Sequence, residues 1–183
     1  MTSVTVYLYP MDKNLKSVFA SIEGGVNHRG LHDLTRPENS LPAIEAAIAE
    51  NRAFECDLHV SKDGRLFVIH DSDLLRMTGK PGIVEELDSE VIRNGYRYED
   101  GSRVAFFDEV VSANDKGVPM VIELKTHPGT NGLLVEAFHP FIAKIPDQGK
   151  SSIISFDRDI LRMVREKGSS LPLGWLHYNK TVR

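Results

Sequence analysis

The sequence predicts an α/β fold of the TIM (β/α)8-barrel type, built on a parallel sheet. Short apolar segments alternate along the chain with segments of helical periodicity, and polar clusters follow the apolar segments. We count six strand candidates in the 183 residues. A complete barrel usually needs about 250 residues, so we expect one that lacks its last two strand–helix units.

The composition is that of an ordinary globular domain, with 41% hydrophobic and 26% charged residues, and we expect one domain over residues 1–183. The net charge of −4 argues against nucleic-acid binding, which usually requires a basic excess. No apolar run approaches the roughly 20 residues of a membrane span, and segment 4–9 is too short for a signal peptide. The single cysteine, Cys56, allows no intrachain disulfide, so we expect a cytoplasmic protein.

The first half of the chain contains, in order, a strand, a helix, a strand, a tight turn and a strand, which we assign to residues 24–28, 41–48, 53–58, 62–65 and 66–69. Ser40 is expected to cap the helix, with Pro42 tolerated in its first turn. The glycine-rich segment 71–103 has an irregular pattern. We interpret it as a small insertion after the third strand, partly helical around residues 88–94.

The second half alternates three helices with three strands. We expect helices over 107–116, over 133–143 with a kink at Pro140, and from a cap at Asp157 to Gly168. The strands are expected over 118–124, 151–155 and 171–176. An unclosed barrel leaves strand edges with unpaired backbone groups. A fragment, a naturally short form, or a homo-oligomer that covers the open edge would each account for this.

Acidic residues alternate along two of the predicted strands. Glu55 and Asp57 are two residues apart and therefore share a face, with Cys56 opposite, and Glu123 shares a face with Lys125. Three carboxylates in a partly dry space raise one another's pKa, and a bound cation removes that conflict. Ligation by oxygen alone favours Mg²⁺ or Ca²⁺ over zinc. We therefore predict Glu55, Asp57 and Glu123 as ligands of one divalent cation.

The other polar groups at strand ends suit a phosphate. Arg29 offers a planar fork to two phosphate oxygens, and Lys125 adds a point charge. The imidazole group is ordinarily suited to proton transfer near neutral pH, so one of His28 and His70 could deprotonate a nucleophile and the other protonate a leaving alkoxide. Asp71 is expected to orient a neighbouring group or to fix its loop. In a barrel, the carboxyl ends of the strands are where active sites lie.

These residues occur in segments that resemble the glycerophosphodiester phosphodiesterase family. The segments are collinear and cover roughly residues 24–176, and together they are highly specific: His28-Arg29-Gly30, Pro37-Glu38-Asn39-Ser40, Glu55-Cys56-Asp57, Lys62-Asp63-Gly64, Val68-Ile69-His70-Asp71, Arg76-Met77-Thr78-Gly79, Ile122-Glu123-Leu124-Lys125 and Ser155-Phe156. The chain departs from the family pattern at Ser40, where Thr is frequent, at Cys56, where Leu is frequent, and by the absence of the last two strand–helix units.

The resemblance implies a TIM barrel with an insertion after the third strand. It also implies hydrolysis of small glycerophosphodiesters to an alcohol and glycerol 3-phosphate, by attack of a glycerol hydroxyl on phosphorus and opening of the cyclic phosphate by water. His28 and His70 match the general acid/base pair. The metal ligands match Glu55, Asp57 and Glu123, and the phosphate contacts match Arg29 and Lys125. We expect Glu38 and Asn39 to contribute to substrate binding, the alternative being loop and helix-entry chemistry.

Each assignment has a structural alternative. Glu55 and Asp57 could form a solvated strand face, Glu123 could simply pair with Lys125, and His70 could lie at the edge of the core. The remaining histidines are expected to be structural or surface residues: His32, His59, His127, His139 and His177. His59 is the least secure of these, because it continues the face of Glu55 and Asp57.

Two alternative functions stay open. A related phosphodiesterase of the lysophospholipase D type would act on lysophospholipids or on another phosphodiester with a larger leaving group, and apolar residues lining the pocket would distinguish it. A barrel without its last units could instead bind a phosphate-bearing ligand without turnover. A phospholipase D-like enzyme acting on sphingolipids fits less well, because the third acid belongs to a Glu-x-Lys pattern.

Overall fold

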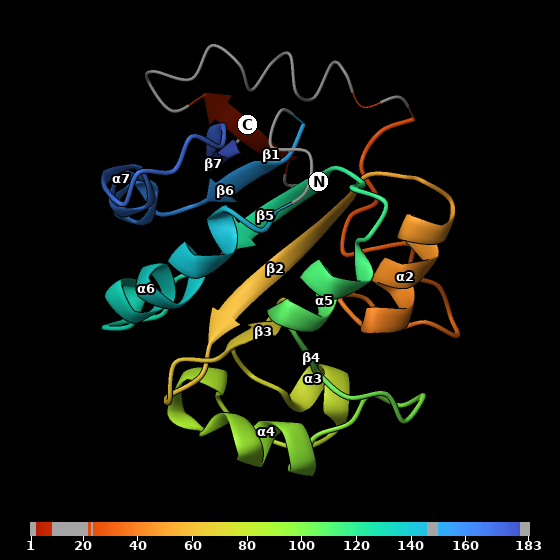
Figure 1. The fold of residues 1–183 in the computed structure, drawn as a ribbon. Helices are drawn as coiled ribbons and strands as arrows, with labels where there is room; N and C mark the ends of the chain where they lie inside the picture. Colours follow the sequence, from red (N-terminus) through yellow and green to blue (C-terminus); the bar gives the residue numbers. More distant parts are fainter. Residues whose placement is uncertain (1–2, 9–21, 23, 146–149, 180–183) are drawn as a thin grey trace.

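The computed structural model describes residues 3–8, 22, 24–145 and 150–179. Within these residues, seven strands form one open sheet in the order β1-β7-β6-β5-β2-β3-β4 (Figure 1). The strands are β1 (Ser3–Leu8), β2 (Phe54–Val60), β3 (Leu66–Val68), β4 (Ala105–Phe106), β5 (Met120–Leu124), β6 (Ser152–Ser155) and β7 (Leu173–Asn179).

The centre of the sheet is parallel, and both of its ends are antiparallel. Strands β2, β5, β6 and β7 run in the same direction, as the alternation of strands and helices predicted. At one end β1 pairs antiparallel with β7. At the other end β3 turns back against β2, and β4 pairs antiparallel with β3. The third predicted strand is therefore confirmed as a strand, but it forms a hairpin with β2 and does not continue the parallel sheet.

The predicted first strand at residues 24–28 is wrong. Asn27 forms a single parallel bridge with Phe54, and no regular strand is assigned around it. Gly24 and Gly25 have φ angles of +80° and +79°, which are incompatible with an extended strand. Strands β1 and β4 were not predicted. The other strands and the helices match the predicted segments to within a few residues at their ends, except for two short helical segments at Leu75–Thr78 and Val84–Glu86, which were not predicted.

Seven helical segments lie within the described part of the chain: α2 (Leu41–Ala49), α3 (Leu75–Thr78), η1 (Val84–Glu86), α4 (Ser89–Gly95), α5 (Phe107–Ala113), α6 (Asn131–Ile142) and α7 (Arg158–Glu166). Two predicted caps are confirmed. The Ser40 hydroxyl accepts a hydrogen bond from Ala43 N at 3.3 Å, and the Asp157 carboxylate accepts one from Asp159 N at 2.7 Å. Among the described residues, no helix is both long enough and apolar enough to cross a bilayer.

The main core lies between the sheet and helices α2, α5, α6 and α7. Alternate strand residues such as Cys56, Leu58, Ile122 and Leu124 point into it, and all four are fully buried. The intervening residues therefore face the opposite side of the sheet, which we call the inner face. A second, smaller core lies beneath α3, η1 and α4 and includes Phe67. Segment 71–103 is thus packed, mostly without long regular elements.

Candidate active site

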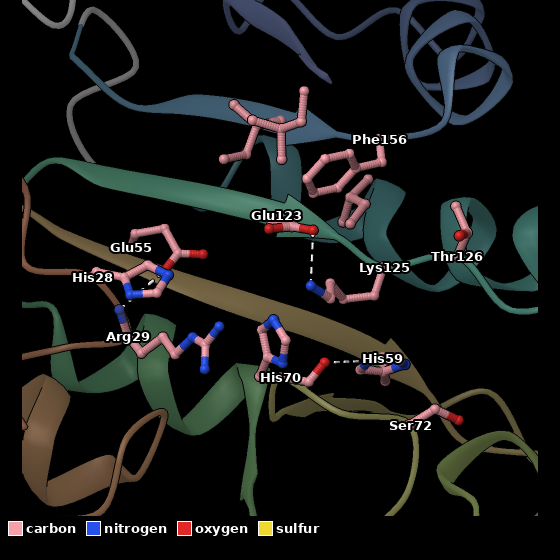
Figure 2. Close-up of a pocket in the computed structure, with 13 residues that line it drawn as sticks. His28, Arg29, Glu55, His59, His70, Ser72, Glu123, Lys125, Thr126 and Phe156 are labelled. Carbon is pink, nitrogen blue, oxygen red and sulfur yellow. Dashed lines mark hydrogen bonds and ion pairs between the residues drawn. The ribbon is translucent and has the colours of Figure 1, made fainter. Parts of the chain in front are cut away.

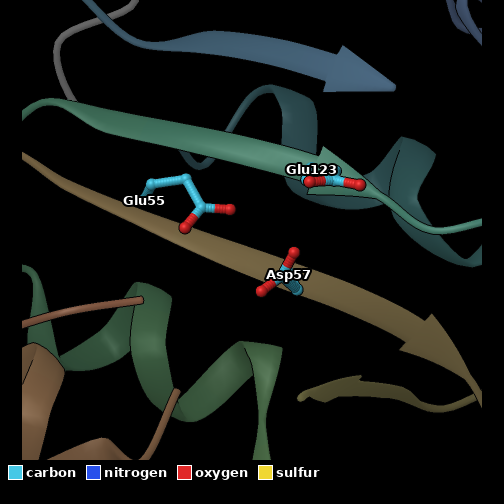
Figure 3. A group of neighbouring side chains, drawn as sticks. All are labelled: Glu55, Asp57 and Glu123. Carbon is cyan, nitrogen blue, oxygen red and sulfur yellow. The ribbon is translucent and has the colours of Figure 1, made fainter. Parts of the chain in front are cut away.

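Three acidic side chains meet on the inner face of the sheet (Figure 3). Glu55 and Asp57 extend from β2, and Glu123 extends from β5. Because these strands are parallel and Asp57 is paired directly with Glu123, the alternation of side chains brings the three acids together. One carboxylate oxygen from each lies within 4.8 Å of the others. The residues that were predicted as metal ligands are therefore neighbours in space.

The environment of these acids disfavours three negative charges. Burial raises the pKa of Glu55 well above its ordinary value, and the nearby charge of Asp57 raises it further. Burial also raises the pKa of Glu123, and Lys125 offsets this only in part. Among the described residues, no hydrogen-bond donor reaches the buried atom Glu55 Oε1. A hard cation would neutralise the cluster and use this free oxygen, so the three carboxylates fit Mg²⁺ or Ca²⁺.

Asp57 is held in place by an amide and a guanidinium. Its Oδ2 accepts a hydrogen bond from Asn39 Nδ2 at 2.7 Å, and its backbone N donates to Asn39 Oδ1 at 3.2 Å. Arg29 Nε lies 3.5 Å from the same Oδ2. Asn39 is fully buried and has a φ of +57°, a left-handed conformation that asparagine tolerates better than most residues. Asn39 therefore orients an acid of the cluster, and its predicted contact with substrate stays a prediction.

The turn at residues 28–30 attaches a histidine and an arginine to the end of the acid cluster. Arg29 N donates to Glu55 Oε2 at 2.9 Å, and Asn27 O accepts a hydrogen bond from Glu55 N at 2.9 Å. Gly30 has a φ of +82°, and a Cβ at this position would come within 2.9 Å of the backbone carbon of Ala43. The turn consequently requires glycine for both its conformation and its packing.

The two histidines that were predicted as the acid/base pair line the same pocket. The His28 side chain is 68% exposed, and its Nε2 lies 3.9 Å from Glu55 Oε2. Partial burial lowers the pKa of His28, and the charge of Arg29 lowers it further. This favours the neutral imidazole near neutral pH.

His70 reaches the site through the β2–β3 hairpin. Ile69 N donates to Asp57 O at 3.0 Å, which aligns the end of β3 with the acid cluster. His70 Nδ1 lies 2.6 Å from Asp71 Oδ1. An ionised carboxylate can only accept a hydrogen bond, so Nδ1 carries the proton and Nε2 remains available for proton transfer. Asp71 thus orients its neighbour, as the sequence predicted.

The two basic groups also contact acids. Lys125 Nζ lies 2.9 Å from Glu123 Oε1 and 3.3 Å from Asp57 Oδ1. The salt bridge that was the structural alternative for Glu123 is therefore present alongside the acid cluster. Arg29 Nη1 donates to Glu38 Oε1 at 2.7 Å. Glu38 consequently fixes the guanidinium, and a direct contact of Glu38 with substrate stays a prediction.

A pocket of about 730 Å³ connects these groups on the inner face (Figure 2). One part of its lining is polar or charged and includes His28, Arg29, Glu55, His70, Glu123 and Lys125. Another part is apolar and comes from the later strands and the segment after β6: Ile154, Phe156 and Leu176. The volume is that of a pocket for a small organic molecule. A charged region beside an apolar wall suits an ester of phosphate that carries an organic group.

Sequence reasoning missed part of this lining, and His59 is the clearest case. His59 is buried on the inner face, where its Nδ1 lies 2.5 Å from Glu85 Oε1 and its Nε2 lies 3.0 Å from the backbone oxygen of His70. Ser72 donates to the second oxygen of Glu85 at 2.6 Å. The two-residue period from Glu55 did indicate that His59 shares the inner face, but its partners are distant in sequence and were not predicted.

The fold and the site together define a barrel-type α/β protein whose pocket combines oxygen ligands for a hard cation with basic groups for an anion. Residues 28–183 match the model of the Glycerophosphoryl diester phosphodiesterase family. The chain therefore belongs to this family.

Individual relatives agree with the family match. The chain is 29% identical over 164 residues to the glycerophosphodiester phosphodiesterase of Caldanaerobacter subterraneus, covering 83% of this chain and 65% of the relative. It is 29% identical over 167 residues to the glycerophosphodiester phosphodiesterase of Bacillus subtilis, covering 80% and 57%.

The predicted fold class is confirmed by a solved structure. The phosphodiesterase of Oleispira antarctica, in complex with its product sn-glycerol-3-phosphate, matches with a TM-score of 0.73 at 18% identity, covering 85% of this chain and 66% of that one. The chain thus has the TIM-barrel-type fold of these proteins, and it spans less than two thirds of the length of each of the three.

Proposed function

We propose that the chain hydrolyses glycerophosphodiesters to an alcohol and glycerol 3-phosphate. The observation that carries the proposal is the cluster of three buried carboxylates within 4.8 Å, lining or bordering one pocket with His28 and His70. Family membership supports the same reaction, and so does the product bound to the Oleispira antarctica relative.

Glu55, Asp57 and Glu123 would hold one divalent cation, Mg²⁺ or Ca²⁺. When bound, the cation supplies positive charge against the negative charge that develops on the phosphoryl oxygens. Without a cation, Lys125 partly compensates the acids through Glu123 and Asp57. Cation binding would weaken this attraction, leaving the ammonium free to contact the phosphate.

Arg29 would orient the phosphate. Its guanidinium is already fixed by Glu38 and lies beside Asp57, so little side-chain freedom remains to be lost on binding. A planar fork that is fixed in this way can donate to two phosphate oxygens at once. The diester would therefore be held between Arg29 and the cation ligands.

His28 and His70 would move the protons. Because the pKa of His28 is lowered, its neutral ring suits the removal of a proton from the attacking glycerol hydroxyl. His70, with Nδ1 bound to Asp71, would present Nε2 to the leaving alkoxide and donate a proton to it. Attack forms a P–O bond to the glycerol oxygen and breaks the P–O bond to the alcohol. Water then opens the cyclic phosphate with the proton transfers reversed.

A lysophospholipid, whose glycerol part carries an acyl chain, is the second candidate substrate, and the apolar wall of the pocket favours it. Ile154, Phe156 and Leu176 line the pocket beside the charged groups. An acyl chain could lie against this wall, as in a phosphodiesterase of the lysophospholipase D type. Relative kcat/KM values for glycerophosphocholine and lysophosphatidylcholine would distinguish the two candidates.

The decisive experiment is hydrolysis of glycerophosphocholine with Mg²⁺ or Ca²⁺, with and without a chelator, measured by release of glycerol 3-phosphate. We expect turnover that the chelator abolishes and the added cation restores. Turnover that survives excess chelator would refute cation dependence. Absence of turnover together with binding of glycerol 3-phosphate would instead support a phosphate-binding barrel without catalysis.

We also propose that the chain forms one domain in which 71–103 is an insertion, that it acts in the cytoplasm, and that a homo-oligomer covers the open edge of the sheet. The buried free thiol of Cys56 is consistent with a reducing compartment. Light scattering coupled to gel filtration would test the assembly, and cell fractionation would test the location.

A further inference from the structure

Arg76 belongs to the segment Arg76-Met77-Thr78-Gly79, to which no step proposed above gives a role. It lies in α3, outside the pocket lining, and its side chain is 47% exposed. Its guanidinium nevertheless donates to two carboxylates from different parts of the chain. Nη2 donates to Glu38 Oε1 at 2.6 Å, and Nε donates to Asp71 Oδ2. One exposed side chain thus connects the loop before α2 with the loop after β3.

Each of these two carboxylates holds a group of the proposed active site. Asp71 contacts the ring of His70 through its other oxygen, at 2.6 Å. Glu38 accepts a hydrogen bond from Arg29 at 2.7 Å, with the same oxygen that accepts from Arg76. A continuous series of contacts therefore links the imidazole to an acid of the cluster. We call it the charged chain, and its members in order are His70, Asp71, Arg76, Glu38, Arg29 and Asp57.

The exposure of Arg76 argues that this arrangement matters little for folding. Exposed ion pairs contribute little to stability, because solvent screens them and ordering long side chains costs entropy. Orientation is different, since a displacement of about 1 Å in a reacting group can change a rate about a hundredfold. A residue at the centre of the charged chain can therefore affect the reaction strongly while affecting stability weakly.

We propose that Arg76 is a positioning residue for the proposed hydrolysis. By holding Asp71 and Glu38 at the same time, it fixes the His70 ring and the Arg29 guanidinium in relation to each other. Both of these groups line the pocket (Figure 2), whereas Arg76 does not contact it. The kinetic part of this inference rests on the proposed function.

The test compares Arg76→Met with Arg65→Met. Methionine keeps an aliphatic stem and removes the guanidinium in both variants. Arg65 is a matched control, because its side chain is 49% exposed and its Nη2 pairs with Asp108 at 3.2 Å, away from the pocket. For glycerophosphocholine we expect Arg76→Met to lower kcat by about ten- to a hundredfold, with a smaller change in KM. Arg65→Met should leave both within about twofold, as a neutral surface change does. An unchanged kcat in Arg76→Met overturns the proposal.

A double-mutant cycle with Asp71→Asn tests whether Arg76 acts through the charged chain. If it does, the effect of Arg76→Met on kcat should be at least about threefold smaller in the Asp71→Asn background than in the wild type, because the two residues act as one unit. Effects that multiply independently would show that Arg76 does not act through Asp71.

A second measurement does not depend on turnover. Long-range ¹H–¹⁵N spectra report which ring nitrogen of His70 is protonated, and the signals can be assigned by their loss in His70→Gln. We expect Arg76→Met, but not Arg65→Met, to move the Nδ1 and Nε2 shifts toward each other as Asp71 loses its fixed orientation. Unchanged His70 signals in Arg76→Met overturn the proposal whatever the kinetics show. A wild type without turnover would refute the proposed function alone, and these spectra would still decide the role of Arg76.

Discussion

Replacing Glu55 by glutamine tests whether the acid cluster is a cation site. Glu55 supplies one of three carboxylates whose oxygens lie within 4.8 Å, and its side chain is only 7% exposed. Two like charges at 4.8 Å repel by about 3.5 kcal/mol when the effective dielectric constant is about 20. Glutamine keeps the shape of the side chain and removes the charge, so the substitution separates electrostatics from packing.

Without a cation, we expect Glu55→Gln to be more stable than the wild type. Protonation already relieves part of the repulsion, because burial and Asp57 raise the pKa of Glu55. We therefore expect a gain of about 1 kcal/mol in the free energy of unfolding, a fraction of the full repulsion. This gain should be absent below the ordinary pKa of about 4.3. It should develop as the pH rises toward the raised pKa, where the folded wild type must carry the buried charge.

With a cation, the order should reverse. At a concentration a hundred times its Kd, Mg²⁺ or Ca²⁺ should stabilise the wild type by about 2.7 kcal/mol. The variant lacks one of three charged ligands and should gain less than about 1 kcal/mol at the same concentration. Urea unfolding followed by circular dichroism, with chelator and with either cation, measures both effects. The exposed residue Glu45 provides the control Glu45→Gln, which should respond like the wild type.

Two results would refute this reasoning. One is a cation-dependent gain in Glu55→Gln equal to that of the wild type, which would locate the cation elsewhere. The other is a wild type that neither cation stabilises, which would mean that Lys125 and Arg29 compensate the acids without a cation.

Three further predictions concern residues around the cluster. His28→Ala should lower kcat for glycerophosphocholine by at least about a hundredfold, and activity near the wild-type level would exclude His28 from proton transfer. Gly30→Ala should cost about 1–3 kcal/mol in thermal unfolding, because its Cβ would come within 2.9 Å of Ala43 at a φ of +82°; a smaller loss would mean that the turn adapts. Glu85→Ala should cost about 3 kcal/mol at neutral pH by removing the carboxylate partner of the buried His59. Burial would raise the pKa of Glu85, but its contacts with His59 lower it more. The stabilisation that Glu85 provides is therefore present above the ordinary pKa of about 4.3 and is lost as the pH falls through the lowered pKa. Urea unfolding across this pH range should show a flatter pH dependence in the variant.

Patterns of short period predicted the acid cluster correctly. Glu55 and Asp57 share a face because side chains alternate along a strand, and Glu123 joins them because parallel neighbours align their inner faces. Local chemistry also identified the caps at Ser40 and Asp157. These features depend on a few consecutive residues, so a single sequence contains the information needed to predict them.

Features that depend on distant partners were not predicted. Nothing near Arg76 in the sequence indicates Glu38 as a partner, and nothing near His59 indicates Glu85. The antiparallel direction of β3 did leave a local signal, because a turn as tight as residues 62–65 joins antiparallel strands only. The alternation of strands and helices nevertheless led to the prediction of an uninterrupted parallel sheet. Strand β4 spans only Ala105–Phe106, too few residues to show alternation.

The direct pairing of Asp57 with Glu123 makes this site sensitive to strand length. Deleting one residue within β2 or β5 would shift the alternation of that strand by one position, so that an acid would enter the hydrophobic core and a core residue such as Cys56 or Leu124 would face the pocket. Surface loops can gain or lose residues without this effect. Redesign of the protein, and divergence among its homologues, should therefore preserve the spacing of these two strands more strictly than the identity of any residue between the acids.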